Sequence, residues 1–361
     1  MVCIASFFVL LILSAVSGKH RKLLRKGWHC FSHRVTFRPC DTTFREEIKT
    51  SLLAPLALRA PRAVRPASVA IEVGAWVTVV SMVITTYIVL HGALNLVAFG
   101  TCNRQNPEAC VLGGQVCGVP ADNPTFWESL TSGDVVGAVR NEATAWGDTF
   151  QALPNRFRNL DGADYVPPYA SFRDGWTEGL PIAIEVIDPG CVFCAELSRN
   201  IAEAELTGTH NVAYLVYPIL FDGGQPQFRN SPLVARWLAA LQIAEHGTDR
   251  AQDPADWFIL DRIFAEEKAM ATGGQFWLNE IAAAEEVEAQ LRTWLREHGY
   301  TQEEIDAVEE LVGSQRVTDL LDAHRAIVED RVRTVTIPTF IGGGSMHRGV
   351  VSVEDLQRLE G

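Results

Sequence analysis

Acidic residues are scarce in the first part of this 361-residue sequence, and basic residues are outnumbered in the second part. Residues 1–99 contain 12 Lys and Arg but only 4 Asp and Glu, a net charge of +8. Residues 100–361 contain 19 Lys and Arg against 40 Asp and Glu, a net charge of −21. Because phosphate binding needs a basic surface, so acidic a region excludes nucleic acid as a partner. The acidic part is also long enough to form a sizeable core.

Charged residues are absent from two apolar segments of the basic part. Residues 73–99 contain no Asp, Glu, Lys or Arg, and as a helix this run reaches roughly 40 Å, more than the ~30 Å core of a bilayer. We therefore predict a transmembrane helix over residues 71–99. Residues 1–18 also lack charge. We interpret this shorter segment as a second span, with a signal peptide as the alternative, although no basic residues precede its apolar stretch.

The basic residues between these segments predict the orientation of the chain. Basic loops remain on the cytoplasmic side of a membrane, so we expect residues 19–70 to be cytoplasmic. Everything after about residue 100 is then outside, which places the protein in the cell membrane with an extracytoplasmic C-terminal domain.

Two histidines and two cysteines of the basic stretch are a candidate zinc set. Zinc sites usually combine a C-x₂₋₄-C pair with an H-x₃₋₅-H pair. The set departs from this spacing and offers no such cysteine pair, so we predict no metal site; its members are His29, Cys30, His33 and Cys40.

The acidic part is predicted to begin with a linker and to continue as one α/β domain. Six prolines lie in residues 118–181, which indicates a linker over residues 100–180 with a few short helices. The Ile- and Val-rich run Ile182–Ile187 is typical of a buried strand, and a helical pattern follows from Cys191. Val212–Leu220 is a second run of strand type.

A helical block separates these strands from the last ones. Proline and glycine residues mark the ends of about four helices in residues 228–331. Strand character returns at Val332–Ile341, where three glycines end it. Gly349–Val351 is predicted as a short strand and Val353–Leu359 as the last helix. This order of elements indicates an α/β domain over residues 181–361 with an all-helical insert.

Cys191 and Cys194 form a C-x-x-C motif at a strand-to-helix junction. A helix N-terminus presents unpaired N–H groups and the positive end of the helix dipole, and both favour a thiolate. We predict that Cys191 lies at the exposed end and attacks, and that the deeper Cys194 resolves the mixed disulfide. A lone C-x-x-C is also half of a zinc site, but the sequence contains no second one.

Two further residues strengthen the redox interpretation. Glu185 lies within the predicted apolar strand, six residues before Cys191. Buried there, its pKa is raised, so it can accept and return the proton of the inner cysteine; an edge-strand Glu facing water is the alternative. Pro338 lies between β-branched residues, where an ordinary central strand excludes proline. A cis Ile337–Pro338 bond beside the site explains it, and a trans proline at a strand start is the alternative.

The strand, the C-x-x-C motif and the later Ile337-Pro338-Thr339-Phe340 with its glycine turn resemble the thioredoxin superfamily. The helical block and the glutamate before the motif resemble DsbA-like thiol:disulfide oxidoreductases. The resemblance covers residues 180–361. It implies a thioredoxin-like fold with an all-helical insert, here preceded by a helical membrane anchor. It also implies that Ile337, beside cis Pro338, offers backbone hydrogen bonds to an extended substrate peptide.

Two residues depart from the family pattern. Gly190 stands where an aromatic residue is common, and the Val-Phe dipeptide between the cysteines lacks the usual Pro or His. Because such residues tune the stability of the thiolate, the direction of electron flow stays open.

Together with the predicted anchor, the resemblance implies a membrane-anchored thiol:disulfide oxidoreductase, for which we predict no cofactor. Its partners are exported cysteine-containing proteins, a membrane or soluble electron-exchange partner, and the lipid bilayer. The alternative is a redox-inactive thioredoxin-fold binding module with a permanent Cys191–Cys194 disulfide, and a metal-carrying domain is the weaker third.

Three cysteines follow the predicted transmembrane helix, where disulfides persist. The simplest interpretation is one structural disulfide, Cys102–Cys110, which leaves Cys117 over. The other interpretation is that one of the three exchanges electrons with the C-x-x-C motif.

Overall fold

The computed structural model describes most of the chain after residue 60. The described residues are 60–359, without 105, 111–112, 120–123, 157, 222 and 266–271, together with residues 28, 50, 53, 54, 57 and 58. The predicted segment 1–18, most of the basic stretch and the His29, Cys30, His33 and Cys40 set lie outside them. The chain divides into two compact units, Met1–His91 and Gly92–Gly361.

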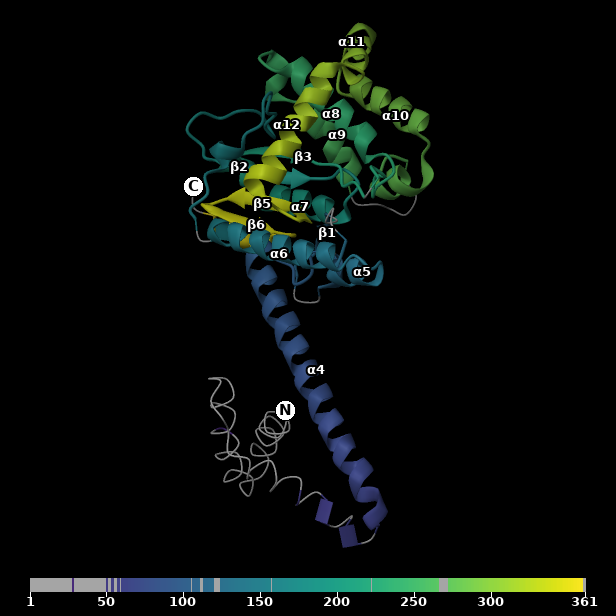
Figure 1. The fold of residues 1–361 in the computed structure, drawn as a ribbon. Coiled ribbons are helices and arrows are strands. Elements are labelled where there is room, and N and C mark those ends of the chain that lie inside the picture. Colours follow the sequence, from purple (N-terminus) through teal and green to yellow (C-terminus); the bar gives the residue numbers. More distant parts are fainter. Residues whose placement is uncertain are drawn as a thin grey trace. The chain divides into compact units, whose positions relative to one another are not determined.

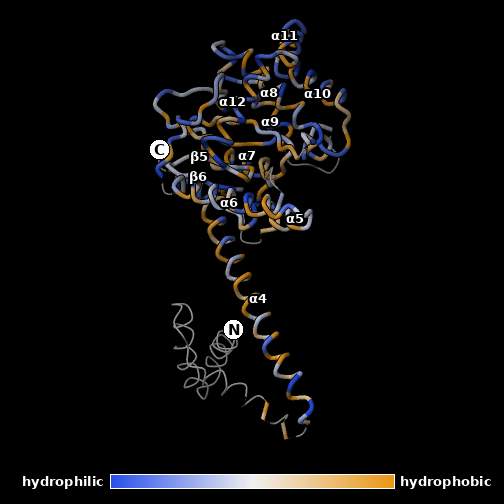
Figure 2. Tube along the Cα trace, in the orientation of Figure 1, coloured by the Kyte–Doolittle hydropathy of each residue, from blue (hydrophilic) through white to orange (hydrophobic). Residues whose placement is uncertain are grey.

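One long apolar helix, α4, covers Val64–Phe99 and is preceded by a 3₁₀ turn at Pro61–Ala63. Pro61 suits this start because its fixed φ angle is already helical. From Pro61 to Phe99 the helix is 39 residues long, and its most apolar part has a mean hydropathy of 2.0, so it is long and apolar enough to cross a membrane. Hydrophobic residues follow one another along it in Figure 2. Large side chains such as Val83 and Val89 are exposed, unlike those of a core helix.

A four-stranded sheet organises the second unit. Its strand order is β3-β2-β5-β6. The middle strand β2 runs parallel to β3 and antiparallel to β5, and β6 is antiparallel to β5. The bounds are Ile182–Ile187 for β2, Asn211–Val216 for β3, Thr339–Gly342 for β5 and Ser345–Arg348 for β6. The strand predicted from Ile/Val content is thus confirmed at its bounds. The short strand predicted at Gly349–Val351 is wrong: Gly349, with φ +84°, turns the chain after β6.

Helices cover the sheet. Helix α7 (Val192–Glu203) follows β2, and the short α13 (Val353–Leu356) packs against it. The predicted insert is helical. It contains α8 (Ser231–Glu245), α9 (Ala255–Phe264), α10 (Ala284–Glu297), α11 (Gln302–Val312), α12 (Gln315–Ala326) and two π-helical turns, Trp277–Ile281 and Ile327–Val332. In the view of Figure 1 these helices lie above the sheet, and α5 and α6 lie below it.

The insert and the sheet share one core. Buried side chains form a continuous hydrophobic cluster that includes Tyr214 on β3 and Trp237 on α8. His324 on α12 is fully buried, and its Nδ1 accepts a hydrogen bond from the Val216 amide at 3.1 Å. Burial lowers the pKa of His324 to about 3, so it serves as a neutral structural contact. The insert is therefore anchored directly on the strand next to β2.

The stretch between α4 and β2 also packs within the second unit. It contains two short 3₁₀ turns around residues 153–165, and Leu160 donates its amide hydrogen to the Gly344 carbonyl at 2.9 Å. The stretch predicted as a linker therefore holds regular elements in contact with the sheet. Its other elements are the 3₁₀ turn Pro107–Ala109, β1 (Cys117–Gly118), α5 (Phe126–Thr131) and α6 (Val135–Ala152).

Candidate active site

The C-x-x-C motif lies where the central strand gives way to α7. Asp188, Pro189 and Gly190 form the turn, and the Cys191 amide donates to the Asp188 carbonyl at 3.0 Å. Cys191 is the N-cap residue of α7, and Cys194 lies in its first turn. The helix N-terminus predicted for the motif is therefore present, and the Cys191 side chain makes no capping hydrogen bond there.

Both cysteines of the motif are completely buried. The prediction that Cys191 lies at an exposed end is therefore wrong. The reason is that two other parts of the chain cover it: a strand that precedes α5, and the helical insert.

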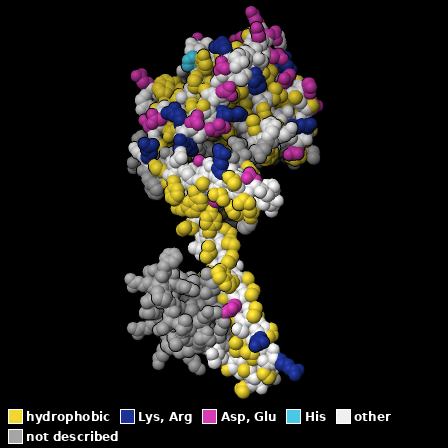
Figure 3. Space-filling view, viewed as in Figure 1, with side chains coloured by type: hydrophobic (Ala, Val, Ile, Leu, Met, Phe, Trp, Pro, Cys, Tyr) yellow, Lys and Arg dark blue, Asp and Glu magenta, His cyan; other side chains and the backbone are white. Residues whose placement is uncertain are grey.

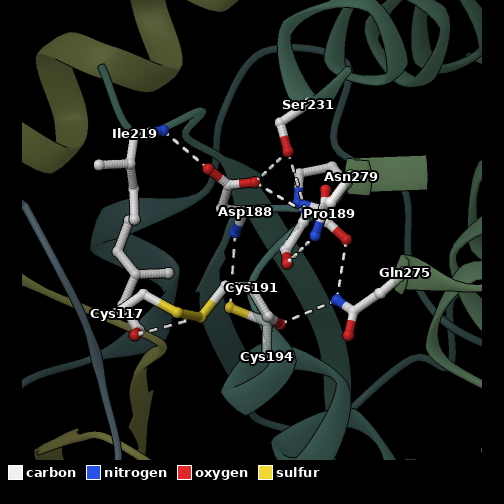
Figure 4. Close-up of a disulfide and its surroundings, with 11 residues drawn as sticks. Cys117, Asp188, Pro189, Cys191, Cys194, Ile219, Ser231, Gln275 and Asn279 are labelled. Carbon is white, nitrogen blue, oxygen red and sulfur yellow. Dashed lines mark hydrogen bonds between the residues drawn. A yellow bond between two sulfur atoms is a disulfide. The ribbon is translucent and has the colours of Figure 1, made fainter. Parts of the chain in front are cut away.

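Cys191 forms a disulfide with Cys117, 74 residues earlier, with Cα atoms 6.2 Å apart. Cys194 is a free thiol, and Figure 4 shows it beside the disulfide. The interpretation of Cys117 as left over is thus wrong. The predicted Cys102–Cys110 disulfide is confirmed, with a Cα–Cα distance of 5.5 Å.

Cys117 belongs to a strand that pairs with the segment before the proline. Strand β1 is antiparallel to β4 (Thr336–Ile337), with Cys117 opposite Ile337. The Val119 amide extends the pairing by donating to the Val335 carbonyl at 2.9 Å. The Ile337–Pro338 bond is cis, and the Ile337 carbonyl oxygen lies 3.7 Å from the Cys191 sulfur. The backbone predicted to receive a substrate peptide is thus paired with the chain's own strand.

Asp188 is a buried carboxylate that the sequence argument treated only as a turn residue. It accepts hydrogen bonds from the Gly190 amide at 2.8 Å, from the Ile219 amide at 2.7 Å and from the Ser231 hydroxyl. Its own amide donates to the Cys194 sulfur at 3.5 Å. Burial raises the pKa of Asp188 to about 6. An acidic residue at the end of an apolar strand, three residues before the motif, was the available signal.

Glu185 lies on the same strand and is 1% exposed. Strand β2 is flanked by β3 and β5, so the edge-strand alternative for Glu185 is wrong. Its Oε1 is buried and accepts no hydrogen bond from the described residues. Burial raises the pKa of Glu185 to about 7, although Arg173 acts in the opposite direction. The carboxyl group therefore changes its charge near neutral pH.

The two carboxyl groups act on Cys194. Burial raises the pKa of the Cys194 thiol well above its ordinary value, and the negative charges of Asp188 and Glu185 raise it further, against the Asp188 amide. A protonated Cys194 is a poor nucleophile. The arrangement can relieve this because Glu185 and Asp188, with pKa values of about 7 and 6, are proton acceptors close to neutral pH.

Two amide side chains of the insert hold the turn before the motif. Gln275 donates from Nε2 to the carbonyls of Pro189 and Cys191, both at 2.9 Å. Asn279 donates from Nδ2 to the Gly190 carbonyl at 2.9 Å. Neither contact was predicted from the sequence. Gln275 and Asn279 lie 84 and 89 positions after the residues that they hold, so no local pattern indicates these hydrogen bonds.

Gly190 is required by close packing. A Cβ atom added at this position would overlap the side chain of Phe228 and lie 2.7 Å from the Ser231 hydroxyl. The departure from the family pattern at Gly190 therefore follows from the insert, because α8 and the segment before it fill the space that a larger residue needs.

The site thus joins the tip of β2, the first turn of α7 and the β4–cis-proline–β5 segment. No group of three or more His, Cys, Asp and Glu suited to a metal ion occurs among the residues that the structure describes.

Solved structures of thioredoxin-fold oxidoreductases are similar to this chain at a remote level. The thiol-disulfide exchange protein alpha-DsbA2 from Wolbachia pipientis shares 14% identity over 54% of this chain and 88% of its own, with a TM-score of 0.39. A thioredoxin-like oxidoreductase from Silicibacter pomeroyi shares 17% over 53% and 89%, with a TM-score of 0.36. ScsC from Proteus mirabilis shares 12% over 64% and 94%, also with a TM-score of 0.36. No family model and no curated protein matches. The assignment of a thioredoxin-like fold rests on the strand order and the cis proline described above.

Proposed function

We propose that this chain is a membrane-anchored thiol:disulfide oxidoreductase that acts on cysteine-containing exported proteins. The observation that carries the proposal is the free, buried Cys194 thiol in the first helical turn after a disulfide-bonded Cys191, where the charges of two buried carboxyl groups act on it. A permanently structural disulfide needs neither a neighbouring thiol nor ionisable groups in its surroundings.

The chemistry begins from a Cys191–Cys194 disulfide. A substrate thiolate attacks the Cys191 sulfur, and the sulfur–sulfur bond to Cys194 breaks, with its electron pair passing to Cys194. Protonated Glu185 supplies the proton that the buried Cys194 thiolate needs. A second substrate thiolate then attacks the substrate sulfur of the mixed disulfide and releases Cys191, so that the substrate is oxidised and the motif reduced. The reverse sequence reduces a substrate disulfide.

Substrate recognition in this proposal uses the backbone before the cis proline. Ile337 is buried and lies next to the Cys191 sulfur. An extended peptide that pairs with Thr336–Ile337 places its cysteine opposite Ile337, within reach of Cys191. Pairing through the backbone accepts many sequences, which suits an enzyme with several substrates.

The membrane part of the proposal is supported by α4 and by the helix that packs at its end. Thr149 on α6 donates to the Asn95 side chain at 2.8 Å, so α6 lies against the last turns of α4. Exposed apolar side chains lie along α6: Val135, Val136, Val139 and Phe150. Figure 3 shows hydrophobic side chains gathered in this region. An exposed apolar helix at the end of a span is suited to the headgroup layer of a bilayer.

The redox proposal is tested by trapping substrates on Cys191. Because Cys117 competes for Cys191 within the molecule, the variant to use is Cys117→Ser with Cys194→Ser, which leaves Cys191 without an internal partner. We expect exported proteins joined to Cys191 by reductant-sensitive bonds on non-reducing gels. A triple variant that also carries Cys191→Ser is the control and should trap nothing. Equal adducts in both would overturn the proposal.

The rival function, a redox-inactive binding module, predicts a different potential. Structural disulfides have reduction potentials below about −300 mV. A measured potential of the full chain in that range would favour the rival, and a higher one favours the oxidoreductase.

The orientation is tested separately by a reporter fused to the C-terminus, which must be active outside the cytoplasm.

A further inference from the structure

We propose that Cys117 is a third redox-active cysteine, and that its strand is a tethered substitute for substrate. In this view Cys191 reaches other proteins only after Cys194 has displaced Cys117. The inference rests on the proposed function and adds to it an internal partner that occupies the peptide site.

The first step of the argument is the position of β1. It pairs antiparallel with β4 and sets Cys117 opposite Ile337, the residue before the cis proline. The Val119 amide adds a further bond to β4 through Val335. This is the position in which a substrate cysteine has to lie to be joined to Cys191. The Cys117–Cys191 disulfide therefore has the form of a mixed disulfide made within one chain.

The second step is burial. Cys191 has no exposed surface, and Cys117 is only 4% exposed. The disulfide cannot meet a second protein while the strand is in place. Val192, the residue that follows Cys191 in the motif, is 55% exposed. Solvent therefore reaches the residue next to Cys191, whereas the Cys191 sulfur is buried. Of the two parts that cover Cys191, the strand is the one that carries its disulfide partner.

The third step is that the preceding loop holds the strand over the site. The Cys102–Cys110 disulfide and the turn at Pro107–Ala109 fold the chain back before β1. A Cβ atom added at Gly118 would lie 2.7 Å from the Pro107 ring, so this glycine lets the loop rest directly on the strand. The closed state is thus built by specific contacts.

The fourth step is an exchange that needs no external oxidant. The Cys194 thiol gives its proton to a buried carboxylate, Glu185 or Asp188, and the resulting thiolate attacks the Cys191 sulfur. The Cys191–Cys117 bond breaks, its electron pair passes to Cys117, and Cys117 takes up a proton. One disulfide and one thiol are present before and after, so the step involves no net oxidation or reduction. The product holds an oxidised Cys191–Cys194 pair and a strand bound only by hydrogen bonds.

The inference is tested first by mapping disulfides in the full-length protein in detergent. After acid quenching and alkylation, proteolysis without reductant should yield a peptide pair joined through Cys117 and Cys191 from the wild type. In Cys194→Ser this pair should be the main product. Cys117 recovered as an alkylated free thiol from both proteins would overturn the inference.

The second measurement is the rate at which a dithiol peptide is oxidised. We expect Cys117→Ser to react about tenfold faster than the wild type, the factor for a protein that is nine-tenths closed. The double variant Cys102→Ser with Cys110→Ser keeps Cys117 but loosens the loop that holds its strand, so its rate should lie between those of the wild type and Cys117→Ser. If Cys117→Ser folds poorly, Val119→Pro serves instead, because it removes one backbone bond to β4 and retains Cys117.

The outcomes separate the two proposals. Oxidation of the peptide at equal rates by wild type and Cys117→Ser would overturn the role of Cys117 and leave the oxidoreductase intact. A mapped Cys117–Cys191 disulfide together with an inert Cys191 in Cys117→Ser would overturn the oxidoreductase, and with it a redox role for Cys117.

Discussion

The two disulfides of the described chain differ in their surroundings. Cys102–Cys110 joins residues eight positions apart within one loop. Cys117–Cys191 joins residues 74 positions apart, at a helix N-terminus and beside the free thiol of Cys194. In the proposed mechanism, the surroundings of a disulfide decide whether it can exchange. The proposal makes the Cys117–Cys191 bond reactive through a nearby thiol and a proton acceptor, and it treats Cys102–Cys110 as a cross-link.

Removal of Cys191 is the most direct test of this contrast between the two disulfides. We expect Cys191→Ser to lower the rate of disulfide exchange with a dithiol peptide by at least about a hundredfold, since in the proposed mechanism the substrate thiolate attacks the Cys191 sulfur. The Cys102→Ser/Cys110→Ser variant should lose no rate, because it retains Cys117, Cys191 and Cys194 and only loosens the loop over the site. Comparable losses in the two variants would show that the loop disulfide is part of the chemistry.

Stability separates the same two bonds. By loop closure, the longer loop makes the Cys117–Cys191 bond worth up to about 4.5 kcal/mol and the shorter one about 2.5 kcal/mol. Cys117→Ser should therefore lower the unfolding free energy of the oxidised protein more than Cys102→Ser/Cys110→Ser does. Denaturant unfolding of each variant checks this. A smaller loss in Cys117→Ser would mean that the wild type rests with its disulfide between Cys191 and Cys194.

The carboxyl group near the exchanging pair predicts a pH dependence. The pKa of Glu185 rises from 4.5 to about 7 on folding. Its contribution to stability is therefore complete below pH 4.5 and is lost as the pH rises through 7, on the order of 3 kcal/mol in all. Unfolding free energies of Glu185→Gln should fall less over this range than those of the wild type. Asp188 and Glu245, whose pKa values are also raised, contribute equally to both proteins, and identical slopes would contradict the prediction.

The smallest effect concerns packing beside the motif. Gly190→Ala should cost about 1–3 kcal/mol, because the new methyl group meets Phe228 and Ser231. Gly208 has no atom within 4 Å of a built Cβ, so Gly208→Ala should change stability by less than about 0.5 kcal/mol. Thermal unfolding of the two variants makes the comparison. Equal values would show that the turn at Gly190 relaxes freely.

Much of the scaffold was predictable because its signals are local. Ile182–Ile187 could be recognised as a strand from its β-branched residues, and Pro338 pointed to a cis bond because a central strand excludes proline. The Cys102–Cys110 pair was predictable because its cysteines are close in sequence.

The closed state of the site was not predictable, because its contacts are distant in sequence. Cys117 was called left over, since pairing by the two-residue strand β1 has no periodicity to detect. Cys191 was expected at an exposed end, because a C-x-x-C motif gives no sign of what lies over it. The partners of Asp188 come from two other segments, at Ile219 and Ser231.

The amide side chains of Gln275 and Asn279 have a consequence for the charge around Cys191. Each peptide carbonyl is the negative end of a dipole, and those of Pro189, Gly190 and Cys191 belong to the turn that carries the sulfur. Their hydrogen bonds to the insert partly neutralise these negative ends. The positive end of α7 then acts on the sulfur with less opposition. Through these three hydrogen bonds the helical insert therefore raises the electrostatic potential at the Cys191 sulfur with neutral side chains.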